Sequence, residues 1–354
     1  MHTTQRLLIA ATSLFLLLLV AAHRDISAYY LVFQLLLAER SSFDFIKCIA
    51  AKPSSVSSGQ HVKVAAAGRQ RWLYFSSSPV CTGPVQEPSE WQSKAVVDCT
   101  LGSSCALASE FFPLDYLGLF VCLVALLPPE ILFDAPRLLI IGGGGGVLAN
   151  VLSRMLPLST TIEVVEPDTA VLHLGTTHFG LPARPATGSV HCHQSFGRKY
   201  VKQHLRRRRP PFDLIILDAF ENDGSESSTP RAWRSRSWCH ELHAALDGRH
   251  GVLAANLYAA DETTEPFRRR CSARFRQPQP RSVDGERIVL QAAPQQSVEA
   301  WRRKSPNAQQ QQAALPGKVE LVRAARGLQQ RSRRPLPLSA VDLGALAGRA
   351  WSGS

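Results

Sequence analysis

The stretch RLLIIGGGGGVLANVL, residues 137–152, decides the fold. An apolar run of strand type leads into five consecutive glycines, and the glycines lead into VLANVL, which reads as the first turns of a helix. A glycine-rich turn between a strand and a helix of an α/β sheet lets the backbone approach a ligand closely. It also presents helix N-terminal amides to polar atoms of that ligand. We therefore interpret residues 142–146 as a cofactor-binding loop rather than as a flexible joint.

The alternation of strand and helix continues downstream to residue 294. Strands are predicted at LLII, TIEVVE, SVHCH, DLIILDAF, GVLAANLY and ERIVLQAA, and helices at VLANVLSRML, TAVLHLGTTHF and FGRKYVKQHL. Strands that alternate with helices form a mostly parallel sheet covered by helices on both faces. The sequence therefore predicts an α/β fold with a doubly wound, mostly parallel, Rossmann-like sheet.

The segments around this sheet differ in composition. Residues 61–110 hold the short strand-like runs HVKVAAA, RQRWLYFSS and KAVVDCTL, which predict a small antiparallel β subdomain before the main domain, 111–294. Residues 23–60 read as a lead-in, partly helical and then Ser-rich. The apolar run at 115–132 favours a buried core helix over a second membrane span. Residues 295–354 are basic and Gln-rich, and we expect a loosely ordered tail with at most one helix.

The N-terminus bears on the compartment. Residues 7–22, LLIAATSLFLLLLVAA, form an apolar run with a small-residue exit, and the run is short for a bilayer span. We interpret residues 1–22 as a signal peptide or uncleaved signal anchor, and the alternative is a buried helix. This interpretation predicts a protein of the secretory pathway, of an organelle or of a membrane, tethered through residues 7–22; the alternative location is the cytoplasm.

The glycine loop discriminates between cofactors. A dinucleotide site needs G-x-G-x-x-G, and Gly142 and Gly144 fit this pattern but Val147 does not. The Gly-Lys-Ser/Thr of a phosphate-binding P-loop is absent. The adenosine-type site of class I methyltransferases remains, and its loop runs through Gly146. Glu166 ends the second predicted strand, where a carboxylate can accept hydrogen bonds from both ribose hydroxyls.

Asp218 follows the fourth predicted strand, at the carboxyl edge of the sheet, where ligands of open α/β folds bind. There it could orient or deprotonate an amine nucleophile, and the alternative is a residue that caps a turn. Asn256, near the end of the next strand, could line the same crevice.

These motifs resemble the spermidine synthase-like branch of S-adenosylmethionine-dependent methyltransferases. The resemblance rests on LLIIGGGGGVLANVL, IEVVEPD, FGLP, FDLIILDAFENDG and GVLAANL, and extends upstream through RWLYFSSSPVCTGPVQ and YLGLFVCLVALLPPE. It covers about residues 61–294. It implies an enzyme that binds S-adenosyl-L-methionine as a small-molecule methyl donor and methylates an amine of a protein substrate.

The resemblance also implies residue roles. The loop glycines Gly142, Gly144 and Gly146 let the methionine part of the donor approach, while Glu166 holds its ribose. Asp168 borders that pocket. Within VHCHQSFGR, Gln194 or a near neighbour contacts the adenine, and Asp218 faces the acceptor as the catalytic residue.

The sequence departs from the aminopropyltransferases of this branch in two places. They carry G-G-G-D-G-G, with an acid inside the glycine loop, and the loop of this chain has no acid. They also carry two acids at the end of the catalytic strand; here Asp218 stands at the first of these positions and Glu221 at the second. Two alternatives therefore stay beside methyl transfer. One is aminopropyl transfer to a polyamine, and the other is a non-catalytic, membrane-tethered binding protein with a decayed site.

Charge and cysteine content bound the other function classes. The net charge is +12, and much of the excess lies in local runs such as the four arginines at 206–209, which argues against one organised nucleic-acid groove. The eight cysteines show no metal-ligand spacing, so no metal site is expected. Cys99 and Cys105 could pair in an oxidising compartment, but free, partly buried thiols are the favoured interpretation.

Overall fold

The computed structural model describes residues 46–82, 92–99, 105–107, 120, 123–124, 127–181, 190–222, 227–258, 264–275, 287–293 and 296–302. The predicted signal peptide or anchor at residues 1–22 lies outside these ranges and stays a prediction. Among the residues that the structure describes, no helix has the length and apolar character needed to cross a bilayer.

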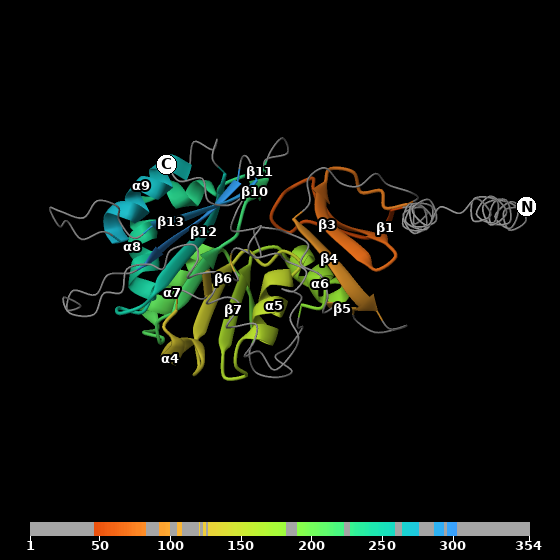
Figure 1. Ribbon diagram of the computed structural model, residues 1–354. Helices are drawn as coiled ribbons and strands as arrows, with labels where there is room; N and C mark the ends of the chain where they lie inside the picture. The colour runs from red at the N-terminus through yellow and green to blue at the C-terminus, as the bar shows by residue number, and fades with distance from the viewer. Residues whose placement is uncertain are drawn as a thin grey trace, which may run out of the picture.

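The larger of the two main sheets has seven strands in the order β13-β14-β12-β9-β6-β7-β8 (Figure 1). They are β6 (Arg137–Ile141), β7 (Thr161–Glu166), β8 (Val190–Gln194), β9 (Leu214–Leu217), β12 (Val252–Tyr258), β13 (Arg287–Ala293) and β14 (Gln296–Arg302). The strands from β8 to β12 in this order pair in parallel, while β14 pairs antiparallel with both β12 and β13. The predicted α/β, doubly wound, mostly parallel sheet is confirmed.

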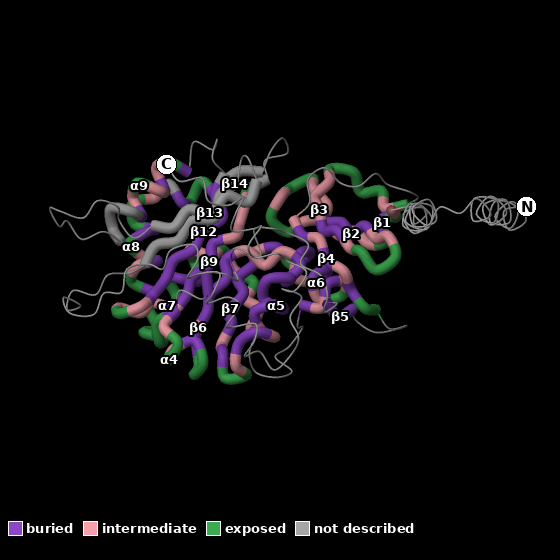
Figure 2. The backbone as a smooth tube through the Cα atoms, viewed as in Figure 1, coloured by how far each residue is buried: buried purple, intermediate pink, exposed green. Residues whose placement is uncertain are grey.

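Helices cover both faces of this sheet. They are α4 (Pro129–Leu132), α5 (Val147–Met155), α6 (Thr169–His178), α7 (Gly197–Arg206), α8 (Arg236–Ala245) and α9 (Thr264–Phe275), with the short η1 (Arg231–Arg234) and the hairpin of β10 (Glu221–Asn222) and β11 (Ser227–Ser228) near the carboxyl edge. Within β6, Leu138 and Ile140 join the core under α5 and α6, whereas Leu139 and Ile141 join a second core under α7, α8 and α9. The strand is apolar from Leu138 to Ile141 because both of its faces are buried (Figure 2).

The smaller sheet is antiparallel and has the order β1-β2-β3-β4-β5. Its strands are β1 (Lys47–Pro53), β2 (His61–Ala67), β3 (Gln70–Ser76), β4 (Ser93–Cys99) and β5 (Cys105–Leu107). The sheet lies beside α6 and α5 (Figure 1). Its inward residues Val64, Leu73 and Val97 belong to the same core as Leu138 and Ile140 of β6. The two sheets are therefore joined by one hydrophobic core on the side of the glycine loop.

Two strands lie in segments for which no strand was expected. β1 falls within the predicted lead-in 23–60, and β14 falls within the predicted tail 295–354. Both strands have mixed compositions, KCIAAKP and QSVEAWR, without the clear alternation that marks a half-buried strand. They are specified by long-range pairing, β1 with β2 and β14 with β12 and β13. The expected tail boundary at residue 295 is therefore wrong, because the sheet continues to Arg302.

The apolar run at 115–132 was expected to form a buried helix. Its described residues Phe120, Leu123 and Val124 are helical and fully buried, and α4 follows after Pro128. They pack in the core shared with β6, which agrees with a core helix.

The expectation of free thiols is wrong. The structure contains the disulfides Cys48–Cys81, Cys99–Cys105 and Cys239–Cys271. The first two lie in and around the small sheet, and the third joins α8 to α9. Strand register and helix packing bring these pairs together, and sequence spacing does not reveal either.

Candidate active site

The glycine loop leads from the end of β6 into α5. Gly142 and Gly146 have φ angles of 106° and 76°, in the left-handed region that side chains rarely adopt. A Cβ atom at Gly142 would lie 2.0 Å from the backbone oxygen of Asp218, and one at Gly146 would lie 2.4 Å from Leu181 Cδ1. The loop needs glycine because its backbone runs directly against its neighbours.

Glu166 ends β7 beside this loop and is 9% exposed. Its Oε2 accepts the Gly143 N–H at 2.9 Å, and its Oε1 accepts the Asp168 N–H at 3.0 Å. Burial raises the pKa of the Glu166 carboxyl, although these backbone hydrogen bonds oppose the rise. Since each carboxylate oxygen has two acceptor sites, the group can take two further hydrogen bonds from a ligand.

Asp168 borders the cavity, but its carboxylate is engaged by the protein. Its Oδ1 accepts the N–H groups of Ala170, which makes it the N-cap of α6, and of Ser55 at 3.1 Å. The hydroxyl groups of Ser54 and Ser55 donate to the same carboxylate. Asp168 therefore holds the β1–β2 loop of the small sheet next to Glu166. The sequence predicted that Asp168 borders the ligand pocket, but it did not predict this structural role.

Gln194 does not reach the cavity. It ends β8 and is exposed, and the cavity wall after this strand is formed by Phe196, Gly197 and Arg198. Of the two options for the adenine contact, Gln194 or a near neighbour, the geometry favours a neighbour. Arg198 is itself held by Glu241 through hydrogen bonds of 2.9 and 3.0 Å.

Asp218 lies one residue beyond β9 and is one of the residues that line the cavity. Asn256, fully buried in β12, donates from Nδ2 to Asp218 Oδ1 at 2.9 Å. Burial raises the pKa of Asp218 to about 6, and the hydrogen bond from Asn256 opposes that rise. A carboxyl group with such a pKa can accept a proton near neutral pH.

One cavity of about 280 Å³ joins these groups, near the lower end of the range for small-molecule sites. It is lined by Val56, Ser57, Phe75, Gln92, Ser93, Lys94, Ile140, Ile141, Gly142, Gly143, Gly144, Val147, Leu148, Ala149, Val164, Val165, Glu166, Pro167, Asp168, Val171, Phe196, Gly197, Arg198, Asp218, Ala219, Phe220, Glu221, Pro230, Ala232 and Trp233. Of the predicted site residues, the structure thus brings together Gly142, Gly144, Glu166, Asp168 and Asp218. Gly146 is not among the residues that line the cavity, because it packs against Leu181.

The small sheet contributes residues that the sequence did not single out. Ser93 at the start of β4 accepts the Gly145 N–H at 2.7 Å, and Val56, Ser57 and Phe75 form part of the wall. Only Phe75 lies in a stretch, RWLYFSS, that the resemblance had marked. Among the described residues no group of His, Cys, Asp or Glu is arranged to hold a metal ion.

The seven-stranded sheet and its glycine loop have the fold of spermidine synthases. A probable spermidine synthase from Corynebacterium glutamicum is similar over 81% of this chain and 94% of its own, with a TM-score of 0.50 and 13% identity. Human methyltransferase-like protein 13 in complex with SAH is similar over 62% of this chain and 93% of its own, with a TM-score of 0.49 and 22% identity. The predicted resemblance is confirmed at the level of the fold.

Comparison of sequences gives a shorter match. A polyamine aminopropyltransferase from Vibrio vulnificus is 28% identical over 126 residues, which cover 36% of this chain. The match spans 39% of the length of that relative. No family model matches the chain.

Proposed function

We propose that this protein is an S-adenosyl-L-methionine-dependent methyltransferase that methylates an amine of a protein substrate. The observation that carries the proposal is the single cavity into which the glycine loop, Glu166 and Asp218 all open. The first two fit the donor, and Asp218 fits the acceptor.

The residues at the donor end suit an adenosyl ligand. A Cβ atom at Gly143 would lie 2.9 Å from Glu166 Cβ, so the loop backbone and the carboxylate form one cradle that a side chain would fill. Glu166 keeps acceptor sites for two ribose hydroxyls after its two backbone hydrogen bonds. The N-terminus of α5 presents backbone amides toward the same space, where a carboxylate of the ligand would be stabilised.

The acceptor end suits an amine. When bound, the donor supplies a methyl group already activated on a sulfonium, so the protein has to align the nucleophile, remove its proton and exclude water. Asp218 Oδ atoms would orient the amine and take its proton. The apolar walls of Phe220 and Trp233 disfavour the charged ammonium form, and a neutral amine is the nucleophile.

Aminopropyl transfer to a polyamine is the second candidate, and the match to a polyamine aminopropyltransferase favours it. Glu221, which lines the cavity near Asp218, supplies a second carboxylate for a cationic acceptor. The glycine loop argues against it, because it lacks the acid of G-G-G-D-G-G.

Titration of the purified protein with S-adenosylmethionine and with its decarboxylated form, by calorimetry, tests the proposal. Tighter binding of S-adenosylmethionine, followed by transfer of its labelled methyl group to protein amines, supports methyl transfer. Preference for the decarboxylated donor supports aminopropyl transfer. Binding of neither compound contradicts both enzymatic candidates and favours the non-catalytic binding protein.

We also propose that the protein folds in an oxidising compartment, as the predicted signal segment suggests. Three disulfides use six of the seven described cysteines, a pattern typical of secretory and extracellular proteins and rare in the cytosol. Deletion of residues 1–22 should move the protein to the cytosol and leave these cysteines reduced. Alkylation of cell fractions followed by peptide mass spectrometry measures both effects, and a full-length protein found in the cytosol with its N-terminus intact would contradict the proposal.

A further inference from the structure

The disulfide Cys99–Cys105 joins two strands that both support the glycine loop. Cys99 ends β4, Cys105 begins β5, and the two residues are direct cross-strand partners. β4 reaches the loop at its other end, where Ser93 Oγ accepts the Gly145 N–H. β5 reaches the loop through the segment that follows α6.

The segment Phe179-Gly180-Leu181 lies between β5 and the loop. A Cβ atom at Gly180 would lie 2.8 Å from the carbonyl oxygen of Cys105, so the two backbones are in contact. On the other side, a Cβ atom at Gly145 would lie 2.9 Å from Phe179 Cδ1, and Leu181 fills the space beside Gly146. Displacement of β5 would therefore weaken the packing of Phe179 and Leu181 against the glycine loop.

β5 is an edge strand of three residues that pairs only with β4 among the described strands. Arg154 Nη2 also donates a hydrogen bond to the Leu107 carbonyl of this strand at 2.6 Å. So short a strand has little stability of its own, and the covalent bond to Cys99 keeps it in register.

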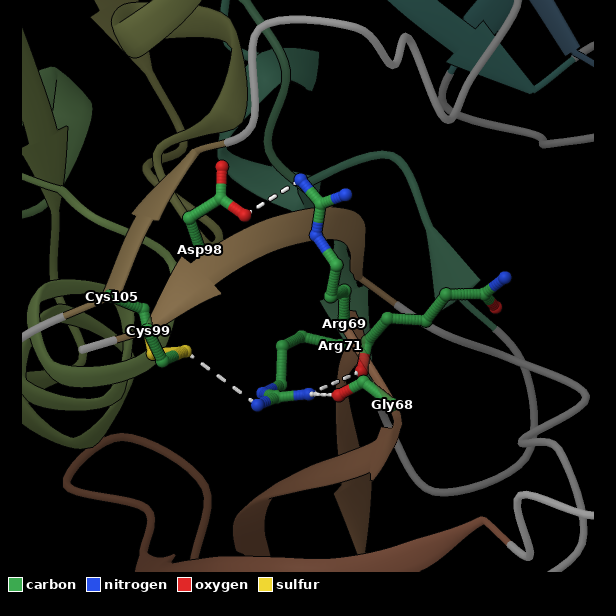
Figure 3. Close-up of a disulfide and its surroundings, with 7 residues drawn as sticks. Gly68, Arg69, Arg71, Asp98, Cys99 and Cys105 are labelled. Carbon is green, nitrogen blue, oxygen red and sulfur yellow. Dashed lines mark hydrogen bonds and ion pairs between the residues drawn. A yellow bond between two sulfur atoms is a disulfide. The ribbon is translucent and has the colours of Figure 1, made fainter. Parts of the chain in front are cut away.

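This disulfide is more accessible than the one between α8 and α9. Cys99 is exposed, whereas Cys239 and Cys271 are 1% and 0% exposed. Figure 3 shows the side chain of Arg71 directed at the disulfide, with Nη2 3.6 Å from Cys99 Sγ. The carbonyls of Gly68 and Gln70 hold this guanidinium in place, and a fixed positive charge stabilises a thiolate.

We propose that Cys99–Cys105 is a thiol–disulfide exchange site, opened by a dithiol reductant, and that its opening weakens donor binding at the glycine loop. A reductant thiolate attacks the exposed Cys99 Sγ and expels Cys105 as a thiolate. The second thiolate of the reductant then attacks the reductant sulfur that is bonded to Cys99 in the mixed disulfide. This step closes the reductant's disulfide and expels Cys99 as a thiolate beside Arg71. The reductant loses two electrons and becomes a disulfide, the protein gains them, and the cysteine thiolates take up protons from water. The effect on donor binding rests on the proposed function, but the exchange itself does not.

Full-length protein titrated with dithiothreitol tests this site. At each step the free thiols are alkylated and assigned by peptide mass spectrometry, amide hydrogen exchange is measured over residues 142–146, and S-adenosylmethionine affinity is measured by calorimetry. We expect Cys99 and Cys105 to react before Cys239 and Cys271, with faster exchange of the loop amides. Donor affinity should fall by about 5- to 150-fold, the usual range of coupling between two sites. Reoxidation should restore it.

Two variants separate the site from general unfolding. A C99S/C105S protein should bind the donor as the reduced wild type does, insensitive to dithiothreitol, and R71Q should slow reduction of this disulfide alone. Reduction of Cys239–Cys271 first, or unchanged loop exchange after Cys99 and Cys105 are reduced, overturns the inference. If the oxidised protein binds no donor, the proposed function fails. The order in which the disulfides are reduced and the amide hydrogen exchange of the loop still test whether Cys99–Cys105 is a thiol–disulfide exchange site. Equal donor affinity in both redox states overturns the coupling.

Discussion

At the scale of single residues, Asp218 and Asn256 form the pair on which the proposed chemistry depends. Asp218 is one of the residues that line the cavity, whereas Asn256 is fully buried and does not line it. The carboxyl group would touch the acceptor, and the amide orients that carboxyl group through the 2.9 Å hydrogen bond. Their roles therefore differ, and different measurements reveal them.

Asp218→Asn should keep donor affinity within a few-fold and slow single-turnover methyl transfer by about 10²–10⁴, the range for loss of a general base. The Asn side chain preserves the shape but cannot take a proton. Asp134→Asn, an exposed position, is the matched control. Full activity of Asp218→Asn would leave Asp218 as a turn residue, and loss of donor binding alone would place it at the donor end.

The pH dependence of the same reaction follows from the pKa of Asp218, which burial raises to about 6. A base must be ionised to act, so the rate should rise with pH through this value. With this pKa, about a tenth of the molecules carry ionised Asp218 at pH 5 and about nine tenths at pH 7. Single-turnover rates at saturating donor measure the midpoint, and a rate independent of pH between 5 and 8 would contradict the role.

Asn256→Leu should raise that midpoint. The hydrogen bond from Asn256 stabilises the ionised carboxylate and opposes the effect of burial, so its removal lets the pKa of Asp218 rise further. Leucine keeps the volume of the buried site. A folded Asn256→Leu protein with an unshifted midpoint would show that the amide only fills space.

At this scale, the sequence correctly predicted cavity residues at the ends of two parallel strands. Glu166 is the last residue of β7, and Asp218 is the first residue after β9. The carboxyl ends of parallel strands meet at one edge, so both residues were predicted to face the ligand. Gln194 also ends a strand, but it is exposed and lies off the cavity wall. The direction of a side chain at a strand end depends on the following turn, which composition does not specify.

At the scale of elements, a polar network ties α7 to the sheet. Glu163 in β7 accepts the Tyr200 hydroxyl of α7 at 3.0 Å, contacts His193 of β8 and lies 3.9 Å from Arg137 of β6. Burial raises the pKa of Glu163, but the hydrogen bonds from His193 and Tyr200 outweigh it and lower the pKa to about 2. The ionised carboxylate therefore stabilises the packing of α7.

Glu163→Gln should lower the free energy of unfolding at pH 7 by about 3 kcal/mol, from a pKa change of about 2.5 units. A carboxyl group with a lowered folded-state pKa stabilises above its ordinary value of 4.5, and this contribution is lost as pH falls toward about 2. The difference between variant and wild type should thus shrink between pH 5 and pH 2. Denaturant unfolding at several pH values measures it, with exposed Glu130→Gln as control, and a pH-independent difference would contradict the mechanism.

Element prediction succeeded where periodicity was strong. The strands β6, β7 and β9 are rich in buried apolar residues because both sheet faces are covered, and α7 shows polar and apolar positions at helical spacing. β1 and β14 were missed, since each takes its conformation from partners distant in sequence. Strand pairing of this kind overrides local propensity.

At the scale of the whole molecule, the small sheet is a structural part of the candidate site. It supports the glycine loop through Ser93 and the turn after β7 through Ser54 and Ser55. The sequence predicted the small sheet but not these contacts. Ser54 and Ser55, for example, lie about a hundred positions along the chain from their partner Asp168. The sequence also did not predict the disulfides, since cysteine spacing does not show which cysteines come close to one another in the fold.

The disulfide Cys239–Cys271 joins α8 and α9 within the core under β12, with both residues essentially unexposed. Replacement of both cysteines by alanine should lower the free energy of unfolding by about 2–4 kcal/mol, because the unfolded chain regains the freedom of the loop that the disulfide closed. Donor affinity at 25 °C should stay within a few-fold, since this disulfide does not contact the cavity. Denaturant unfolding and calorimetry measure the two quantities, and a large loss of affinity without loss of stability would contradict this separation.

The proposed function requires the cavity to hold S-adenosylmethionine through the glycine loop and Glu166. Calorimetric titration of wild-type and Glu166→Ala proteins with S-adenosylmethionine tests it most directly, with exposed Glu130→Ala as the matched control and thermal unfolding to verify folding. We expect wild type and Glu130→Ala to bind alike, and Glu166→Ala to bind more weakly by about 1.5–3 kcal/mol, the scale of lost charged hydrogen bonds. Unchanged affinity in a folded Glu166→Ala protein, or no binding by the wild type, would contradict it.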